Sequence, residues 1–291
     1  MGFEPTTYSL GDLEGHDKDS LNAFREWLFA TYSKQHAQNL FNYTVKCQHM
    51  LLNSREASAM LTFTPTKRHL AMLALSSWSK WTGCYDRFKE LKERLGLKWS
   101  ADNGSEAFRR LLEESTEIED IEVWLGQVKM LGWEYYFPTV FMALTGLRPS
   151  EACLSLSMLA EKSGEGYYNK ELKALEHFRS KVFLRRTKNA YISFVSERVL
   201  EEALAYGKSV SWNKMRSRIR RASLEVRFHD LRKAWATKLH ESGIPQESVD
   251  LLQGRISQNV FARFYYRPSL QALGLKVLEV LKPLENRLLE A

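Results

Sequence analysis

A short stretch of the sequence, residues 226–268, concentrates side chains that can act on a phosphate group. His229 and Arg232 are three residues apart, so a helix would project both from one face. Arg255 follows a glycine further along, and a tyrosine pair begins ten residues later at Tyr265. Guanidinium groups bind phosphate oxygens bidentately, and an activated phenol is a nucleophile. The stretch therefore predicts a nucleophile beside a clamp for phosphate.

Two places upstream add charged groups to this set. Arg148 lies in the sequence TGLRPSE, where Gly146 and Pro149 are typical of one helix ending and another beginning. Glu151 comes three residues later, close enough in sequence to hold the guanidinium of Arg148. Lys188 falls at the tip of a predicted β-hairpin, between two runs of β-prone residues. Both cations are candidates for phosphate binding or proton transfer.

Each of these residues also has an ordinary structural interpretation when it is taken alone. An arginine at a helix start can serve a salt bridge, and a lysine at a hairpin tip is usually only solvated. The spacing H-x-x-R occurs by chance in many helices, and a tyrosine in an amphipathic segment is usually packed in a core. The order of the whole set along the chain is more specific than any member of it.

The chain is predicted to be mainly α-helical and to divide into two domains. Residues 1–16 are polar and predict a flexible tail. Residues 17–99 predict a module of four helices, whose basic residues either face a phosphate backbone or form a solvated surface. The segment 99–105 lacks periodicity and carries turn residues, so we expect a linker there. A second domain then covers residues 100–291. In a chain of 291 residues, two domains of ordinary size are expected.

The second domain is expected to combine helices with one small β-hairpin or sheet. The hairpin pairs the β-prone runs 182–184 and 191–195 around Lys188. An amphipathic C-terminal pattern over 269–291 is interrupted by Pro283. The remaining helices are predicted at 105–114, 118–130, 134–145, 149–158, 196–205, 212–223, 229–242, 245–252 and 260–266.

Composition narrows the class of protein further. The 42 lysines and arginines exceed the 35 aspartates and glutamates and crowd into the second half, which fits a polyanionic partner. Three scattered cysteines show neither zinc-ligand nor disulfide spacing. There is no apolar run of the ~20 residues that span a bilayer, and the first residues lack signal-peptide features. The modest surplus of basic residues would also fit many metabolic enzymes, and we expect a cytoplasmic protein without membrane contact.

The complete constellation resembles the tyrosine recombinase (phage-type integrase) family. T-G-L-R-x-x-E matches the first box of that family, H-D-L-R matches the second, and the downstream tyrosine matches the nucleophile box. The resemblance covers the chain from about Ser20, and its motifs are strong from Thr145 onward. It implies a helical core-binding domain followed by a catalytic domain, which together close around duplex DNA as a clamp.

One departure from the family pattern sharpens the resemblance. The family commonly has Leu-Gly-His after H-x-x-R, with the nucleophile nine residues beyond that histidine. This chain has Leu-Gln-Gly-Arg ending at Arg255, and Tyr265 lies ten residues beyond it. The variant is similar to the fusellovirus-type integrases of archaeal viruses and plasmids. The resemblance therefore implies Tyr265 as nucleophile and Tyr266 as reserve, because a spacing of nine would place Phe264 there.

The resemblance implies a role for each charged residue in DNA cleavage. Attack of Tyr265 on a phosphodiester adds negative charge in the transition state, which Arg148, Arg232 and Arg255 would clamp. The product is a 3′-phosphotyrosine, which conserves the bond energy, so strands can be rejoined without ATP. We expect no cofactor and no metal, since the sequence has neither a P-loop nor an acidic cluster typical of two-metal nucleases.

The departing 5′ oxygen needs a proton, and the resemblance implies Lys188 as its general acid. Lys181 or Arg186 could replace it, because the register of the predicted hairpin is open. His229 would orient the phosphate or help to move the proton.

Double-stranded DNA is the expected partner, bound by a homotetramer on synapsed duplexes. Phosphate contacts are expected mainly from basic residues in both domains. The C-terminal helix either docks on a neighbouring protomer, as the family implies, or packs on its own domain. The residues expected to bind DNA are Lys67, Arg68, Lys214, Arg216, Arg218, Arg220 and Arg221.

Two other functions remain open at this point. A type IB topoisomerase would use the same chemistry but relax DNA as a monomer, which the short chain and small first module disfavour. A non-catalytic DNA-binding relative would have lost activity through the arginine that replaces histidine at Arg255. We expect a site-specific recombinase that cleaves and rejoins DNA.

Overall fold

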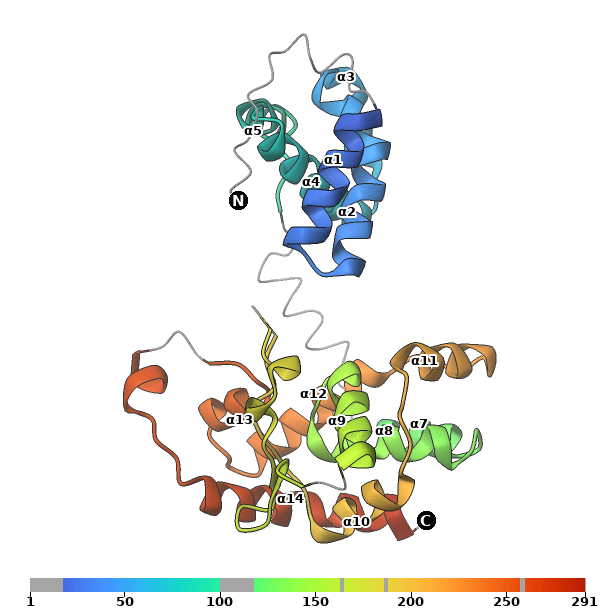
Figure 1. Cartoon of the computed structure of the whole chain (residues 1–291), viewed down its shortest axis with the longest axis vertical. Helices are drawn as coiled ribbons and strands as arrows, with labels where there is room; N and C mark the ends of the chain where they lie inside the picture. The colour runs from blue at the N-terminus through green and yellow to red at the C-terminus, as the bar shows by residue number, and fades with distance from the viewer. Residues whose placement is uncertain (1–17, 100–117, 163–164, 186–187, 257–259, 291) are drawn as a thin grey trace. The chain divides into compact units, whose positions relative to one another are not determined.

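A computed structural model shows a mainly helical chain with a small antiparallel sheet (Figure 1). Contacts divide the chain into two compact units, residues 1–114 and 115–291. The predicted tail, the linker after Trp99 and the helix predicted at 105–114 lie outside the described residues. The structure describes residues 18–99, 118–162, 165–185, 188–256 and 260–290.

The first unit is a helical module whose apolar stripes meet in one core. Phe24, Leu28, Leu40, Leu75 and Trp78 are all fully or almost fully buried there. The four predicted helices are confirmed, whereas a short helix and two 3-10 turns between the second and third were not predicted. The elements are α1 (Lys18–Thr31), α2 (Lys34–Cys47), η2 (Gln48–Leu51), α3 (Ser54–Ala57), η3 (Ser58–Thr62), α4 (Pro65–Trp81) and α5 (Tyr85–Arg94).

The second unit is built around one largely apolar helix, α8 (Trp133–Thr145). Every residue from Tyr136 to Thr145 is buried, and α8 contacts α7, α9, α10, α12 and α14. From Tyr136 onward the helix has no solvent face, which explains why this part of its sequence lacks a polar stripe. Around it lie α7 (Ile118–Lys129), α9 (Pro149–Lys162), α10 (Glu197–Tyr206), α11 (Trp212–Arg221), α12 (Phe228–Glu241), α13 (Gln246–Leu252), the π-helical turn η6 (Phe261–Tyr265) and α14 (Leu270–Glu290).

The small sheet differs from the predicted hairpin. Its antiparallel strands run in the order β1 (Tyr168–Asn169), β2 (Ala174–Leu175) and β3 (Ser193–Phe194). The second predicted run thus supplies β3, but β3 pairs with β2, and Lys181–Phe183 forms a 3-10 turn instead of a strand. Phe183 is buried against the ring of His177 at 4.7 Å between centroids. Tertiary burial of this ring outweighs the local β preference.

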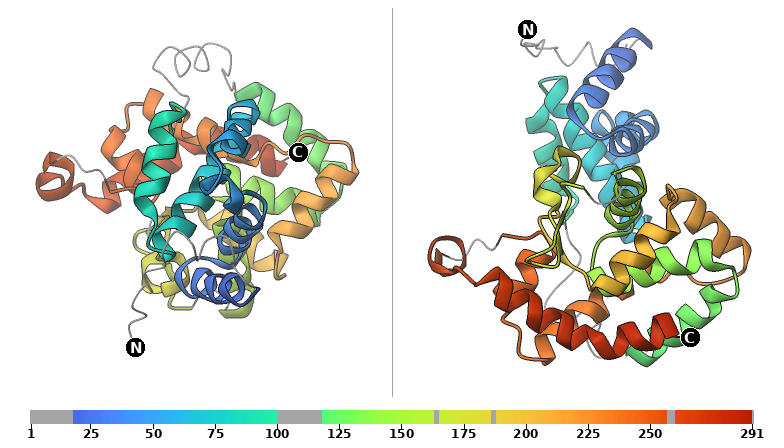
Figure 2. Two further views of the ribbon diagram at one scale, coloured as in Figure 1. Left: turned by 90° about the horizontal axis from the view of Figure 1, so that it is seen from above. Right: turned by 60° about the horizontal axis from the view of Figure 1, so that its bottom comes forward.

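The C-terminal helix α14 is continuous, so the predicted interruption at Pro283 is wrong. Pro283 is exposed, and the carbonyl one turn before it can be hydrated, which makes the loss of one helical hydrogen bond tolerable. The apolar side of α14 packs on its own unit. In Figure 2, α14 is the long red helix that runs along this unit. Its buried apolar side chains are Leu273, Val277, Leu281, Leu284 and Leu288.

Among the described residues, none of the helices is both long enough and apolar enough to cross a membrane.

Candidate active site

Arg148 lies in the turn between α8 and α9, and the local sequence dictates that turn. Gly146 follows α8 in the left-handed conformation, with φ of 64°, which costs glycine little. A Cβ atom on Gly146 would lie 2.5 Å from the ring of Trp235, so no larger residue fits. Pro149 then begins α9 with a φ suited to a first helical position. The predicted helix end and helix start are both confirmed.

Glu151 holds Arg148, as the spacing predicted. The guanidinium Nη1 of Arg148 donates to Oε1 of Glu151 at 2.7 Å, and the backbone N–H of Arg148 donates to Oε2 at 3.0 Å. The Glu151 side chain is 1% exposed and the Arg148 side chain 22% exposed. Within the described residues, Nε and Nη2 of Arg148 make no hydrogen bond. These donors can bind an anion.

Arg232 comes from α12 and is buried beside the same turn. Its Nη1 donates to the carbonyl of Gly146, and its Nη2 donates to the carbonyl of Gln253. The side-chain amide of Gln253 donates back to the carbonyl of Arg232 at 3.3 Å. Arg232 therefore joins the Arg148 turn to the chain segment that precedes Arg255.

The three arginines influence one another electrostatically. The pKa of Arg232 is lowered to about 10, mainly by burial and in part by the guanidiniums of Arg148 and Arg255, while Glu151 acts in the opposite direction. Like charges brought together in a partly buried place are unfavourable unless an anion joins them. The arrangement thus favours binding of a group such as a phosphate.

Arg255 sits just after α13 on a tight turn. The N–H groups of Gly254 and Arg255 donate to the carbonyls of Leu251 and Asp250, respectively, which is the Schellman pattern that ends many helices. The Arg255 side chain is 61% exposed, and its Nη1 lies 3.7 Å from Oδ1 of Asp250. Arg255 is accessible, in contrast to Arg232.

His229 lies in the first turn of α12, three residues before Arg232. Its side chain is exposed, whereas that of Arg232 is 6% exposed. The H-x-x-R pair therefore spans the boundary between core and surface, which places His229 on the solvent side of the buried arginine.

Lys188 is exposed, and the next residue, Asn189, contacts Arg148. The carbonyl of Asn189 accepts a hydrogen bond from Nη1 of Arg148 at 3.1 Å. Of the two replacement candidates, Lys181 is exposed in the 3-10 turn, and Arg186 lies outside the described residues. The backbone of the lysine segment is thus in contact with one of the three arginines.

The tyrosine pair has two different environments. Tyr265 is 72% exposed at the end of η6, in a short segment that projects from the second unit (Figures 1 and 2). The hydroxyl of Tyr266 forms a 2.6 Å hydrogen bond with that of Ser248, whose side chain is buried. The hydroxyl of Tyr266 is thus held by a hydrogen bond to α13, whereas the side chain of Tyr265 is accessible to solvent. Among the described residues, no hydrogen bond joins Tyr265 to the arginines.

The residues predicted to contact DNA lie on exposed surfaces, with one qualification in the first unit. The guanidinium of Arg68 donates to the carbonyls of Met60, Leu61 and Phe63, so it caps the preceding 3-10 turn. The ammonium of Lys67 lies 3.9 Å from the centroid of the Phe63 ring. In the second unit, the exposed side of α11 carries five basic residues and no acidic one, namely Lys214, Arg216, Arg218, Arg220 and Arg221.

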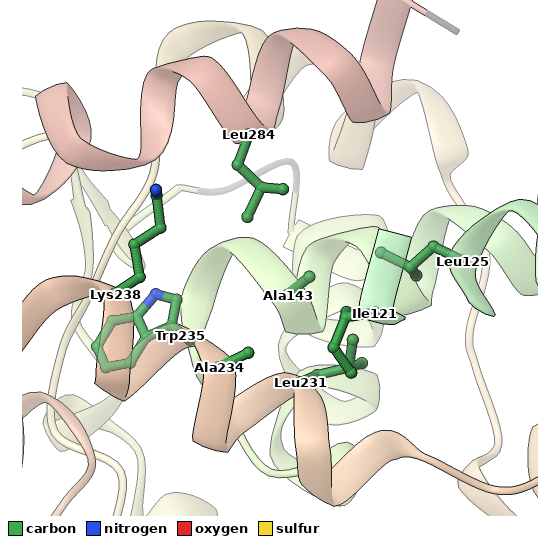
Figure 3. Close-up of a pocket in the computed structure, with 8 residues that line it drawn as sticks. All are labelled: Ile121, Leu125, Ala143, Leu231, Ala234, Trp235, Lys238 and Leu284. Carbon is green, nitrogen blue, oxygen red and sulfur yellow. The ribbon is translucent and has the colours of Figure 1, made fainter. Parts of the chain in front are cut away.

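A small pocket lies in the core of the second unit, between α7, α8, α12 and α14. Figure 3 shows Leu284 directed from α14 toward α8 and α12. Its lining is apolar except for Lys238, and it includes Trp235, the ring that packs against Gly146. This pocket belongs to the support of the Arg148 turn. Among the residues that the structure describes, no cluster of three histidines, cysteines or carboxylates could hold a metal ion.

Sequence reasoning missed three residues that assemble the site, namely Asn189, Gln253 and Trp235. Two of them contribute backbone carbonyls, and the third packs its ring against a glycine. Such contributions leave no spacing signal, because any residue type supplies a carbonyl. A glycine before Arg255 was visible in the sequence, but the close contact that requires it was not.

Comparison of the sequence with protein-family models and with curated proteins gives no match. The resemblance to a family therefore rests on the sequence motifs alone.

Proposed function

We propose that this chain is a site-specific DNA recombinase of the tyrosine type, which cleaves and rejoins duplex DNA through a 3′-phosphotyrosine. One observation carries the proposal: Arg232, from α12, donates to the carbonyls of Gly146 and Gln253, and each of these residues lies two positions before one of the other arginines. Arg232 is 6% exposed, and an arginine is rarely so buried unless its charge is paired or binds an anion. A clamp of this kind fits a phosphodiester, whose transition state gains negative charge.

The chemistry can be assigned to the residues of this chain. The phenol oxygen of Tyr265 attacks phosphorus, a new P–O bond forms, and the bond to the 5′ oxygen breaks. The phenol loses its proton to solvent, and Lys188 gives a proton to the departing 5′ oxygen. The arginines stabilise the charge on the non-bridging oxygens, and His229 orients the phosphate. Rejoining reverses these steps with a new 5′ hydroxyl.

The projecting position of Tyr265 sets a requirement for this mechanism. The segment that ends at Tyr265 must move toward its own arginines, or it must serve the arginines of a second copy. Either route agrees with cleavage within a homotetramer on two synapsed duplexes. Mixing Tyr265→Phe with Arg255→Ala separates the two, because only delivery to a second copy restores cleavage.

The proposal is tested with nicked duplexes that tile the DNA around the chain's own gene. Cleavage of a phosphodiester a few nucleotides before the nick releases the short strand that carries the 5′ hydroxyl. Its loss prevents rejoining and traps the covalent protein–DNA adduct, which is resolved on a denaturing gel. We expect the adduct to disappear in Tyr265→Phe and to persist in Tyr266→Phe, which serves as the matched control. If the adduct instead persists in Tyr265→Phe and is lost in Tyr266→Phe, the nucleophile is Tyr266 and not Tyr265.

The same assay decides between the alternatives. No adduct with both tyrosines intact would indicate a DNA-binding relative without catalytic activity. An adduct together with relaxation of supercoiled DNA by single copies, without pairing of two duplexes, would indicate a type IB topoisomerase. Pairing of two duplexes followed by exchange of strands supports the recombinase.

A further inference from the structure

The backbone of Asn189 lies where three parts of the proposed site meet. Its carbonyl accepts a hydrogen bond from Nη1 of Arg148 at 3.1 Å. The same carbonyl oxygen lies so close to Gly254 that a Cβ atom there would be only 1.7 Å away. Lys188 precedes Asn189, and Arg255 follows Gly254. One peptide therefore contacts the turns of two arginines and adjoins the lysine.

The side chain of Asn189 fixes the same segment from within. Its Oδ1 accepts from the backbone N–H of Arg185 at 2.7 Å, and its Nδ2 donates to the hydroxyl of Tyr191 at 3.0 Å. The next backbone N–H, that of Ala190, donates to the carbonyl of Phe183 at 3.1 Å. Both ends of the amide are used, so the backbone from which Lys188 projects has little rotational freedom.

We propose that Asn189 is the positioning residue of Lys188. It holds the lysine segment between the Arg148 guanidinium and the Gly254 turn, so that the ammonium starts from a fixed point beside the arginine clamp. The inference rests on the proposed function, in which Lys188 protonates the departing 5′ oxygen. Asn189 itself touches no reacting atom, and its effect should therefore fall on the proton-transfer step.

Gly254 explains why the contact is tight. Its φ is 69° and it is buried, so glycine is favoured there for two separate reasons. Any side chain would displace the carbonyl of Asn189, and a misplacement of about 1 Å at a catalytic group can cost ~10²-fold in rate. Gly254→Ala should thus act on Lys188 through Asn189.

The test compares two nicked duplexes that differ in one atom. One has the normal phosphodiester, and the other has sulfur in place of the bridging 5′ oxygen. When Tyr265 attacks the second, the P–S bond breaks and a thiolate leaves. A thiolate is a stable leaving group at neutral pH and needs no proton donor. Variants that only misplace the general acid should recover on the sulfur substrate, whereas variants of the clamp should not.

Four kinds of variant make the comparison specific. Asn189→Ala and Gly254→Ala test the inference, Lys188→Ala shows the full effect of losing the acid, and Arg148→Ala shows a clamp defect. The matched control is Gly243→Ala. Gly243 also has a positive φ, of 78°, but the nearest atom to its Cβ would be Nζ of Lys276 at 3.7 Å. It therefore carries the backbone strain without the contact.

We expect Asn189→Ala and Gly254→Ala to form adduct about 10–10²-fold more slowly on the normal substrate, in line with loss of an aligned general acid. On the sulfur substrate both should return to within about threefold of the wild-type rate, as Lys188→Ala does. Arg148→Ala should stay slow on both. Gly243→Ala should match the wild-type chain on both.

Three results would overturn the inference. The first is a wild-type rate for Asn189→Ala on the normal substrate. The second is an equal defect of Asn189→Ala on both substrates, with unchanged thermal unfolding. The third is failure of Lys188→Ala to recover. If Gly254→Ala unfolds at lower temperature than Gly243→Ala, Tyr191→Phe replaces it, because it removes one anchor of the Asn189 amide. No adduct from the wild-type chain on either substrate would instead refute the proposed function.

Discussion

Arg232 and Arg255 belong to one proposed clamp but occupy opposite environments. Arg232 is buried and donates to two backbone carbonyls from different turns. Arg255 is mostly exposed, and within the described residues its guanidinium has one ion-pair partner, Asp250, at 3.7 Å. A residue that both shapes a site and binds a ligand should affect stability and activity together. A residue that only binds should affect activity alone.

We therefore predict a clear separation between two alanine variants. Arg255→Ala should lower the rate of adduct formation by ~10²–10³, as for other preorganised oxyanion donors, with unchanged unfolding in urea. Arg232→Ala should lose activity and also about 2–4 kcal/mol of unfolding free energy, because two buried carbonyls lose their donors.

The comparison uses urea unfolding and adduct formation on the same protein preparations. Equal stability of the two variants would show that the carbonyl contacts of Arg232 contribute nothing. A large loss of stability in Arg255→Ala would contradict the exposed position of that side chain.

At the scale of elements, a buried polar chain connects α9 with the small sheet. The imidazole of His177 is fully buried, with Nδ1 2.6 Å from the hydroxyl of Tyr167 and Nε2 2.9 Å from that of Ser193. Tyr167 in turn donates to Ser155 of α9 at 2.8 Å. The segment that leads to Lys188 begins at His177. The hydrogen bonds of His177 therefore anchor the start of that segment.

The buried imidazole of His177 predicts a pH dependence of stability. Burial lowers the pKa of His177 to about 3, whereas the unfolded chain has its ordinary value of about 6.5. Below pH 6.5 the unfolded state therefore binds a proton that the folded state does not, and stability falls with falling pH. Between pH 6 and pH 4 this group should account for about 2–3 kcal/mol of lost unfolding free energy.

The measurement is urea unfolding at several pH values for the wild-type chain and for His177→Gln. Glutamine keeps hydrogen-bonding groups at this place but does not titrate. The two curves of unfolding free energy against pH should converge as the pH falls from 6 to 4. Parallel curves over that range would show that His177 is not the group responsible.

The helices and the sheet differ in how far the sequence predicted them. Helical periodicity with caps such as Thr64 and Gly146 located helices well, because those signals act within one turn. The hairpin around Lys188 was wrong, because strand pairing depends on partners distant in sequence, here β2 with β3. Pro283 was read as a break, yet its exposed position lets α14 continue.

At the scale of the whole molecule, the most direct support for a polyanionic partner is the basic face of α11. That helix contains five basic residues and no acidic one. An ordinary solvated helix face carries both signs of charge. A helix surface with positive charges and no negative ones is expected to contact phosphates without reading sequence.

We predict that alanine at Arg216 weakens binding of any duplex to a similar extent. Each phosphate contact removed should reduce the slope of log affinity against log salt concentration by about 1. The matched control is Lys282→Ala, an exposed lysine on α14, which should leave the slope unchanged. Fluorescence anisotropy over a series of salt concentrations measures both. Unchanged slopes for Arg216→Ala would remove α11 from the DNA-binding surface.

The sequence by itself predicted the mainly helical class, which is confirmed, and it singled out Arg148, Lys188, His229, Arg232 and Arg255, which stay predictions as a site. Those predictions depend on residue type and short spacing, which local backbone geometry converts directly into position. The spacing of Glu151 from Arg148 even predicted their ion pair, which is confirmed.

Only the tertiary structure decided how these residues meet. The contacts that join the turns are carbonyls of Gly146, Asn189 and Gln253, and every residue type has a carbonyl. The choice between Tyr265 and Tyr266 as the accessible phenol likewise depended on Ser248, which lies seventeen and eighteen positions before them. Long-range packing fixes such pairings, and no periodicity in the sequence encodes them.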